Sequence, residues 1–370
     1  MRYHIAHRKL ASSLFAVVIA FAATPCRAID FATIESAWRD RERNTPSVVL
    51  RWNESRVHVA PRPAADGKMS KDPITQEVPN VVMYLRDGQA RLEDSPNKST
   101  AAEDVNPQIE AFDKNEARSL YSVKAQKYGV IRAEKRPAFS GQMNSWPPLL
   151  LYRGLDDSLI SLTLAAFAPG KGELRENPNG TVTLRTSAPI PRVAAATWTL
   201  TLRPDLNYAP VQLTGLSGDT PFFDLKISYG QLVRGIPIPT AWSVSGLNSA
   251  GALIASVRAT VTSTDLDTAP AAELFDLSFP DGTMVYDMRP KIGGGEMRTY
   301  LVTDRGERDV LDAELLRGAT IDQLRATRSG EAGLPGSAWH GSWLFWANVV
   351  VVLVVAVALI ARYLRRSYAV

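Results

Sequence analysis

Cysteine is almost absent from this sequence, which carries a single one, Cys26, among its 370 residues. A lone thiol excludes an internal disulfide framework and a C-x-x-C centre for zinc or redox chemistry. Histidine is nearly as scarce, because only His58 and His340 remain once His4 and His7, near the N-terminus, are set aside. A histidine-rich metal centre or a Ser-His-Asp triad therefore has few candidates. We predict no metal ion and no cofactor.

Catalytic motifs are missing as well. The sequence has no phosphate-binding loop, no G-x-S-x-G nucleophile elbow and no H-E-x-x-H zinc helix. Two acidic pairs, Asp156-Asp157 and Asp265 with Asp267, lack the remaining ligands of a calcium loop, so solvated carboxylates are the simpler interpretation. The sequence therefore predicts that the protein is not an enzyme.

The net charge of +4 is made by the two ends of the chain. Seven of the 42 lysines and arginines lie in residues 1–28 and 362–370, where no acidic residue occurs. The remaining 35 stand against 38 acidic residues, so the body of the chain is slightly negative. Nucleic acid is excluded as a partner, because its phosphates require a basic surface.

The N-terminal segment has the layout of a secretory signal peptide. Residues 1–9 are basic, Leu10 to Thr24 are apolar, and small residues follow at Cys26 and Ala28. We predict cleavage after residue 28. Lipidation of Cys26 is the alternative, although Pro25 occupies the place where the processing enzyme requires a small residue.

The C-terminal segment has the layout of a transmembrane helix. Trp343 to Ala361 form an apolar run, and about 20 residues at ~1.5 Å each span the hydrocarbon layer. Arg362, Arg365 and Arg366 follow at once, which places the tail in the cytoplasm and the body outside it. The alternatives are a buried core helix and a sortase-type sorting signal that begins near residue 334. We predict a single-pass protein of the cytoplasmic (inner) membrane, with its body in the periplasm or another extracytoplasmic space.

The body of the chain opens with helix and strand signals. Asp30 is a candidate N-cap for a helix whose apolar face carries residues 31, 34, 37, 38 and 41 and which ends near residue 45. Residues 47–59 alternate as a half-buried strand, and Asp87-Gly88 favours a hairpin turn between two further strands. Residues 95–117 are polar and predict a loop with a short helix. Residues 149–152 and 158–167 are apolar and fit either a helix or short strands.

From Gly172 onwards the pattern is that of successive β-strands. Alternating runs recur at short intervals with turn residues between them, which favours one continuous antiparallel sheet. The expected strands are residues 173–175, 181–186, 195–202, 208–213, 222–232, 239–245, 252–261 and the region of Leu277. Residues 284–287 and 296–302 predict a small hairpin, and residues 309–327 predict helical or irregular structure.

Four short segments carry a resemblance to a known family. They are Trp198–Pro204 with Tyr208–Val211, and Ile227–Tyr229 with Gly235–Trp242. Together they resemble the lipoprotein-carrier (LolA-like) superfamily of periplasmic proteins. A fifth segment, Phe275–Asp287, resembles the closing segment of related membrane-anchored proteins. The resemblance covers roughly residues 29–290. It implies a curved half-barrel sheet covered by helices, with an apolar concavity for acyl chains.

These observations together define the expected architecture. The fold class is α+β and mainly antiparallel β: a curved half-barrel sheet with covering helices, plus one C-terminal transmembrane helix. The expected parts are a signal peptide at 1–28, a LolA-like β-rich domain at 29–290, a small hairpin and juxtamembrane linker at 291–341, the transmembrane helix at 342–362 and a cytoplasmic tail at 363–370.

Aromatic and aliphatic side chains on the predicted strands are the candidate ligand-binding residues of the concavity. They are Trp52, Trp198, Leu200, Phe222, Leu225, Ile227 and Trp242. The alternative is that they form an ordinary core, which any curved sheet requires. We predict a membrane-anchored periplasmic protein that binds a lipid, an acyl chain or a lipoprotein. The alternative function is an envelope regulatory or interaction protein that acts through a partner membrane protein.

Overall fold

The computed structural model describes residues 29–59, 62–63, 69–70, 73–94, 108–123, 126–134, 145–154, 163–187, 196–290 and 297–326. The chain divides into two compact units, residues 1–307 and residues 308–370. The described part of the first unit holds most of a large, mainly antiparallel sheet and two α-helices, α2 (Phe31–Asn44) and α3 (Trp146–Arg153). The described part of the second unit holds two short helices, α5 (Asp312–Leu316) and α6 (Ile321–Ala326).

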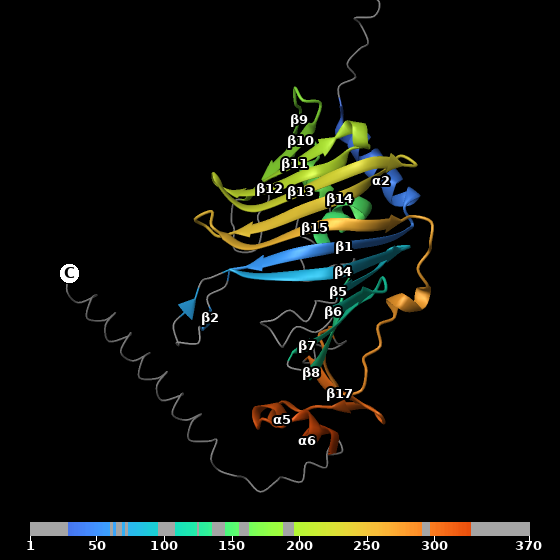
Figure 1. Cartoon of the computed structure of the whole chain (residues 1–370), viewed down its shortest axis with the longest axis vertical. Helices are drawn as coiled ribbons and strands as arrows, with labels where there is room; N and C mark the ends of the chain where they lie inside the picture. The colour runs from blue at the N-terminus through green and yellow to red at the C-terminus, as the bar shows by residue number, and fades with distance from the viewer. Residues whose placement is uncertain are drawn as a thin grey trace, which may run out of the picture. The chain divides into compact units, whose positions relative to one another are not determined.

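The large sheet has 16 described strands in the order β18-β17-β16-β8-β7-β6-β5-β4-β1-β15-β14-β13-β12-β11-β10-β9 (Figure 1). Their bounds are β1 Ser47–His58, β4 Ile74–Arg86, β5 Gln89–Asp94, β6 Gln108–Phe112, β7 Glu116–Val123, β8 Gln126–Ala133, β9 Gly172–Glu176, β10 Val182–Ser187, β11 Ala196–Arg203, β12 Ala209–Ser217, β13 Thr220–Val233, β14 Ile236–Leu247, β15 Leu253–Asp265, β16 Thr283–Asp287, β17 Arg298–Thr303 and β18 Gly306–Asp309. Two short strands, β2 (Arg62–Pro63) and β3 (Met69–Ser70), pair with each other. Three 3-10 helices, η2 (Leu164–Phe167), η3 (Pro204–Leu206) and η4 (Ala272–Phe275), complete the described elements of the first unit.

Helix α2 and strand β1 form where the local sequence pattern predicts them. The Asp30 carboxylate accepts a hydrogen bond from the backbone N–H of Thr33 at 2.7 Å, which satisfies one free donor of the first turn. Trp38 lies on the buried face of α2, and its indole N–H donates to the Tyr208 carbonyl at 2.7 Å. The predicted N-terminal helix, the strand after it and the hairpin at Asp87-Gly88 are all confirmed.

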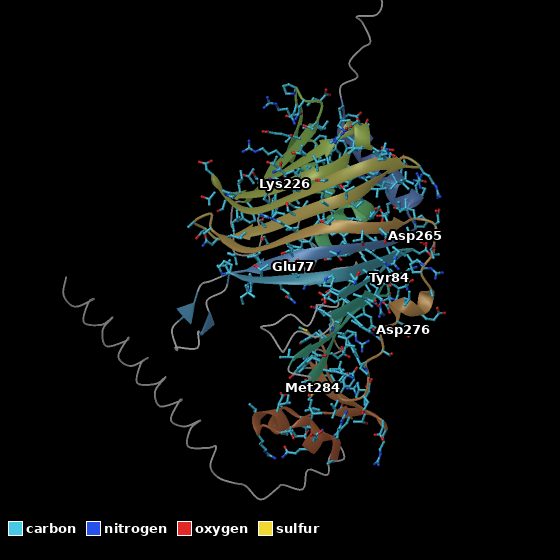
Figure 2. All side chains as sticks on the ribbon, in the orientation of Figure 1. Glu77, Tyr84, Lys226, Asp265, Asp276 and Met284 are labelled. Atoms are coloured by element: carbon cyan, nitrogen blue, oxygen red, sulfur yellow. The ribbon has the colours of Figure 1, made fainter. Side chains whose placement is uncertain are left out.

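In the meander β9 to β15, apolar and polar residues alternate along the strands. Along β11, every second residue from Ala196 to Leu202 is buried, and the threonines between them are only half-buried. Because successive side chains of a strand point to opposite faces, one face of this sheet packs a core and the other meets solvent. Polar side chains such as Glu77 and Lys226 lie on the solvent face (Figure 2). The strands predicted between residues 173 and 261 are confirmed.

Helix α3 covers the core face of the meander. Its first turn carries Pro147 and Pro148, whose missing N–H groups cost nothing at a helix start. The helix ends at Gly154, where φ is 78°, a conformation that glycine adopts at no steric cost. All six residues from Pro147 to Tyr152 are buried. The apolar run at 149–152, which fits helix or strand by sequence, is therefore helix.

Gly215 is required by a close approach of aromatic rings. A Cβ at this position would lie 2.6 Å from Cζ of Phe222 and 2.9 Å from Cζ3 of Trp198. We expect Gly215→Ala to lower the free energy of unfolding by about 1–3 kcal/mol through overpacking. Urea unfolding followed by tryptophan fluorescence measures the loss. Gly230→Ala is the matched control, because its nearest neighbour is the Thr240 methyl at 3.1 Å. Equal losses in the two variants would contradict this account.

The other half of the sheet departs from the sequence expectation. Residues 108–112 and residues 116 and 117 lie in the stretch predicted as loop with a short helix, but they form β6 and the start of β7. The predicted strand near Leu277 is absent from the described residues there, which form η4 and irregular structure. The small hairpin of β16 with β17 is confirmed, and β16 also pairs in parallel with β8.

The predicted fold class needs correction. The first unit is an open, mainly antiparallel sheet with few helices among its described residues, rather than a half-barrel broadly covered by helices. The predicted transmembrane helix at 342–362 lies outside the described residues, as does the predicted signal peptide at 1–28. Among the residues that are described, no helix is long and apolar enough to cross a membrane.

Candidate functional site

The seven residues predicted to line a concavity come together in one place. All belong to a single hydrophobic cluster, in which six are buried and Phe222 packs at the margin. Trp52 and Trp242 meet edge to face with ring centroids 5.1 Å apart, and Trp198 meets Phe222 in the same way at 5.3 Å. Such aromatic pairs stabilise a core beyond the area that they bury.

Helix α3 fills the space against which these residues pack. Its side chains Leu149, Leu150, Leu151 and Tyr152 are buried in the same hydrophobic cluster. Trp146 packs on Phe223 with ring centroids 5.5 Å apart. The protein's own side chains thus occupy this face, and the binding of a ligand by the seven residues remains a prediction.

A pocket lies beside this core, where two neighbouring strands separate. β14 pairs with β15 from Ala241 opposite Thr260 to Leu247 opposite Leu253. Beyond Thr260, β15 continues to Asp265 paired with β1 alone, while the first residues of β14 pair with β13 alone. Pro237 and Pro239 occupy this part of β14 and have no N–H to donate, so proline is accepted here as it is on an edge strand.

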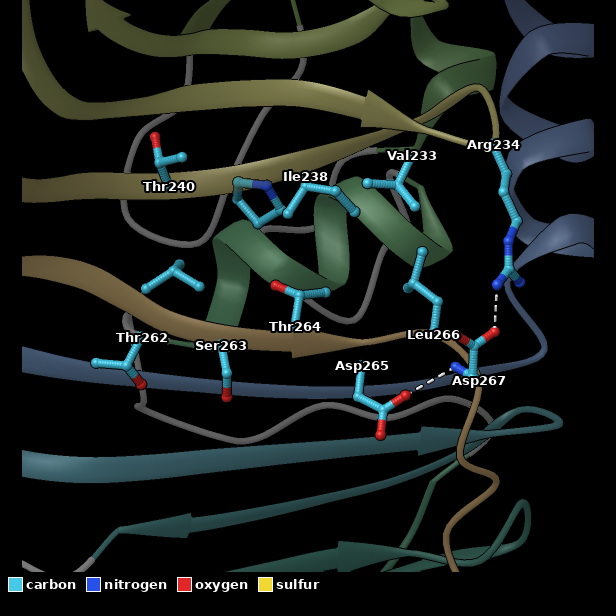
Figure 3. Close-up of a pocket in the computed structure, with 12 residues that line it drawn as sticks. Val233, Arg234, Ile238, Thr240, Thr262, Ser263, Thr264, Asp265, Leu266 and Asp267 are labelled. Carbon is cyan, nitrogen blue, oxygen red and sulfur yellow. Dashed lines mark hydrogen bonds and ion pairs between the residues drawn. The ribbon is translucent and has the colours of Figure 1, made fainter.

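The pocket between the separated strands has a volume of about 360 Å³. Three of its lining residues, Ile238, Val261 and Leu266, pack against the hydrophobic cluster and give it an apolar floor. The other lining residues are Val233, Arg234, Pro239, Thr240, Thr262, Ser263, Thr264, Asp265 and Asp267 (Figure 3). The pocket thus combines an apolar floor with walls rich in hydroxyl groups.

Charged groups mark the rim of the pocket. The Arg234 guanidinium lies 2.6 Å from the Asp267 carboxylate, and both side chains are largely exposed, so the pair contributes little to stability. The Asp265 carboxylate accepts hydrogen bonds from the backbone N–H groups of Asp267 and Thr268 at 2.8 and 3.0 Å. Hydrogen bonds from the side chain and backbone of Thr268 lower the pKa of Asp265, which keeps it ionised at neutral pH.

The acidic pair noted in the sequence, Asp265 with Asp267, therefore lies at a pocket rim. No group of three or more His, Cys, Asp or Glu side chains is placed to hold a metal ion in the described part of the chain. The other pair, Asp156-Asp157, falls outside the described residues. His58 is an exposed residue at the end of β1.

A buried cationic cluster lies between α2, α3 and β13. Arg41 is 2% exposed, and its Nη1 donates to the Asn207 carbonyl at 3.3 Å. Burial lowers the pKa of Arg41 to about 10, so its guanidinium still carries a charge at neutral pH. Tyr152 and Tyr229 lie within electrostatic range of this charge, and burial raises the pKa of both hydroxyls.

Arg153 extends the cluster from the end of α3. Its Nη1 donates to the carbonyl oxygens of Thr45 at 3.0 Å and Tyr152 at 2.9 Å. Burial lowers its pKa, while Glu42 and Asp87 act in the opposite direction. Arg41 Nη2, Arg153 Nη2 and the Tyr152 hydroxyl are buried polar atoms without a hydrogen-bond partner among the described residues. A buried polar group without a partner is costly, so three such atoms on neighbouring side chains call for a physical explanation.

Comparison with known proteins gives distant structural matches. The chain is similar to a LolA superfamily protein from Nitrosomonas europaea, at 10% sequence identity and a TM-score of 0.36, over 66% of this chain and 97% of that chain. It is also similar to a DUF1329 family protein from Desulfovibrio piger, at 12% identity and a TM-score of 0.33, over 66% of this chain and 96% of that chain. Both matches have low identity and a low TM-score, so the resemblance to the LolA-like superfamily stays a prediction from the sequence, and neither match says what this chain binds. No protein-family description and no curated protein matches the chain.

Proposed function

We propose that this protein binds an apolar chain, belonging to a lipid or a lipoprotein, in the pocket between β14 and β15. The observation that supports this most directly is that β14 separates from β15 at a place where the hydrophobic cluster lies next to the gap in pairing. A chain that enters between them leaves water and contacts Ile238, Val261 and Leu266 without displacing any strand pairing. The proposed role is binding and not catalysis.

The size and rim of the pocket agree with an apolar ligand. Its volume of about 360 Å³ lies near the lower end of the range for small-molecule sites. Leu232 and Val233, next to the pocket at the turn between β13 and β14, are 42% and 44% exposed. Large apolar side chains at a pocket rim are typical of a surface that receives an apolar partner.

Thr264 offers a sharp test of the pocket. Its hydroxyl is buried without a hydrogen-bond partner in the described part of the chain, and its side chain lines the pocket. We expect Thr264→Trp, which fills the space, to weaken binding of the uncharged dye Nile red by about tenfold or more, since ~1.4 kcal/mol is tenfold in affinity. Thr264→Val keeps the shape and is expected to bind as the parent does. Fluorescence titration measures both, and equal binding by all three proteins would place the dye elsewhere.

A second experiment asks what the protein carries from the cell. Native mass spectrometry of protein purified without detergent is expected to show a bound mass of lipid size that disappears on denaturation. A clean protein mass, together with no dye binding, would overturn the proposal and favour the interaction role. The extracytoplasmic location remains a prediction from residues 1–28, which cell fractionation tests.

A further inference from the structure

We propose that Arg41, Tyr152 and Arg153 form an interior anion subsite, which holds the carboxylate of a single-chain fatty acid whose hydrocarbon occupies the pocket between β14 and β15. This inference rests on the proposed function and narrows it to one ligand class. It also gives a role to three buried polar atoms that otherwise have none among the described residues.

The first argument is the charge balance around Arg41. The groups that act electrostatically on its guanidinium are the hydroxyls of Tyr152 and Tyr229, and no carboxylate is among them. Arg308, the other buried arginine among the described residues, binds Glu314 at 2.7 Å, and the half-buried Arg56 binds Asp94 at 2.6 Å. Arg153 already has Glu42 and Asp87 within electrostatic range. The charge without a carboxylate partner among the described residues is therefore that of Arg41, and a bound anion removes the cost of burying it.

The second argument is the supply of free donors. Arg41 Nη2, Arg153 Nη2 and the Tyr152 hydroxyl each have a hydrogen to donate and no acceptor among the described residues. The Tyr229 hydroxyl does not count among these donors, because it already donates its hydrogen to the Pro210 carbonyl at 2.6 Å. A carboxylate offers two oxygens that accept several such bonds, and arginine binds this group in a favourable planar geometry.

The third argument is the position of the subsite next to the pocket. Tyr229 on β13 stands opposite Pro239 on β14, and Pro239 lines the pocket. Ile238 and Leu266 of the pocket floor pack against the same hydrophobic cluster that contains Tyr152. Figure 3 shows α3, which carries Tyr152 and Arg153, behind the two separated strands. Helix α3 packs against β13, the strand next to β14, and the proposal takes the ligand from the pocket to this helix.

The fourth argument is ligand size. A pocket of about 360 Å³ suits one hydrocarbon chain better than the several chains of a phospholipid or a lipoprotein. A single chain that ends in a carboxylate satisfies both the apolar floor and the interior donors. An uncharged chain of equal length makes only the apolar contacts with the pocket floor and leaves the interior donors without an acceptor.

A purely structural role for this cluster makes a different prediction. Arg41 also joins α2 to the Asn207 carbonyl, so its replacement lowers stability whether or not an anion binds. Tyr152→Phe separates the two roles, because it removes only a hydroxyl that has no hydrogen-bond partner among the residues that the structure describes. Without ligand, this variant is expected to be as stable as the parent or slightly more stable.

The experiment measures displacement of Nile red from the full chain by hexadecanoic acid and by hexadecanol. In the parent protein the acid is expected to bind about tenfold to a hundredfold more tightly than the alcohol, from charge-assisted hydrogen bonds. Tyr152→Phe is expected to weaken the acid about tenfold and to leave the alcohol unchanged. Arg41→Met is expected to remove the preference for the acid altogether.

The outcomes distinguish this inference from the function on which it rests. If both compounds displace the dye equally in the parent, the anion subsite is wrong and binding of apolar chains stands. If Tyr152→Phe weakens both compounds alike, the hydroxyl supports the fold and not a carboxylate. If neither compound binds and Nile red does not bind either, the proposed function fails together with the subsite.

Discussion

Replacing Arg56 by methionine is expected to lower the free energy of unfolding by about 3–5 kcal/mol. Arg56 lies between two buried carboxylates on neighbouring parts of the sheet: it binds Glu54 on its own strand and Asp94 on β5, the latter at 2.6 Å. The two carboxylate side chains are 0% and 3% exposed. Burial acts to lower the pKa of Arg56, but both carboxylates outweigh it and raise that pKa. Methionine leaves two buried negative charges without the cation that they share.

Chemical denaturation of the purified variant measures this loss. Arg43→Met is the control, because Arg43 pairs with Asp40 at 3.2 Å on the exposed surface of α2 and is expected to cost less than about 0.5 kcal/mol. Neutralising the whole group in the triple variant Glu54→Gln, Asp94→Asn, Arg56→Met is expected to recover much of the loss. A loss for Arg56→Met as small as that for Arg43→Met would show that water reaches these carboxylates.

Replacing Trp52 by alanine is expected to cost about 3–5 kcal/mol, the usual penalty for removing a fully buried tryptophan. Trp52 is 0% exposed, packs edge to face on Trp242 with centroids 5.1 Å apart, and donates from its indole N–H to Glu54 at 2.7 Å. The substitution opens a cavity in the hydrophobic cluster and withdraws a donor from a buried carboxylate.

A double-mutant cycle separates these contributions. Trp52→Ala and Trp242→Ala are expected to be non-additive by about 0.5–1.5 kcal/mol, the coupling of an aromatic pair. Trp52→Phe keeps most of the packing and is expected to cost less than Trp52→Ala. If the phenylalanine and alanine variants are equally unstable, the hydrogen bond to Glu54 dominates over packing.

Local patterns account for the parts of the fold that could be predicted. The N-cap at Asp30, the turn at Asp87-Gly88 and the alternation in β11 each act within a few residues, so the sequence displays them directly. The sequence pattern does not predict β6, because the buried face of this strand carries Glu110, which is 3% exposed, where a strand normally shows an apolar residue. The parallel pairing of β16 with β8 joins segments far apart in the chain and leaves no local sign.

The candidate site is less predictable from the sequence, because it depends on contacts between segments that are far apart in the chain. The sequence identifies aromatic residues that share a face, but it does not show that α3 packs against them. The alternate prolines Pro237 and Pro239 indicate that β14 has an unpaired side, but they also belong to a segment that carries the family resemblance. Arg41 stood among the apolar positions of α2, and its charge at such a position was the sign of a buried polar group.

The pairing of β1 with β15 has a consequence for how the protein reaches its native state. β1 pairs with β4 on one side and with β15 on the other. The second pairing forms only after β15 is in place, and β4 to β14 all lie between β1 and β15 in the chain. Such long-range pairing lowers folding rates, because chain entropy is lost before the contact forms. During synthesis the β1 side of an early hairpin exposes unpaired backbone groups, a template for mispairing with another chain. Folding is therefore expected to be slow and to profit from a holding chaperone until the last strands of the meander are made.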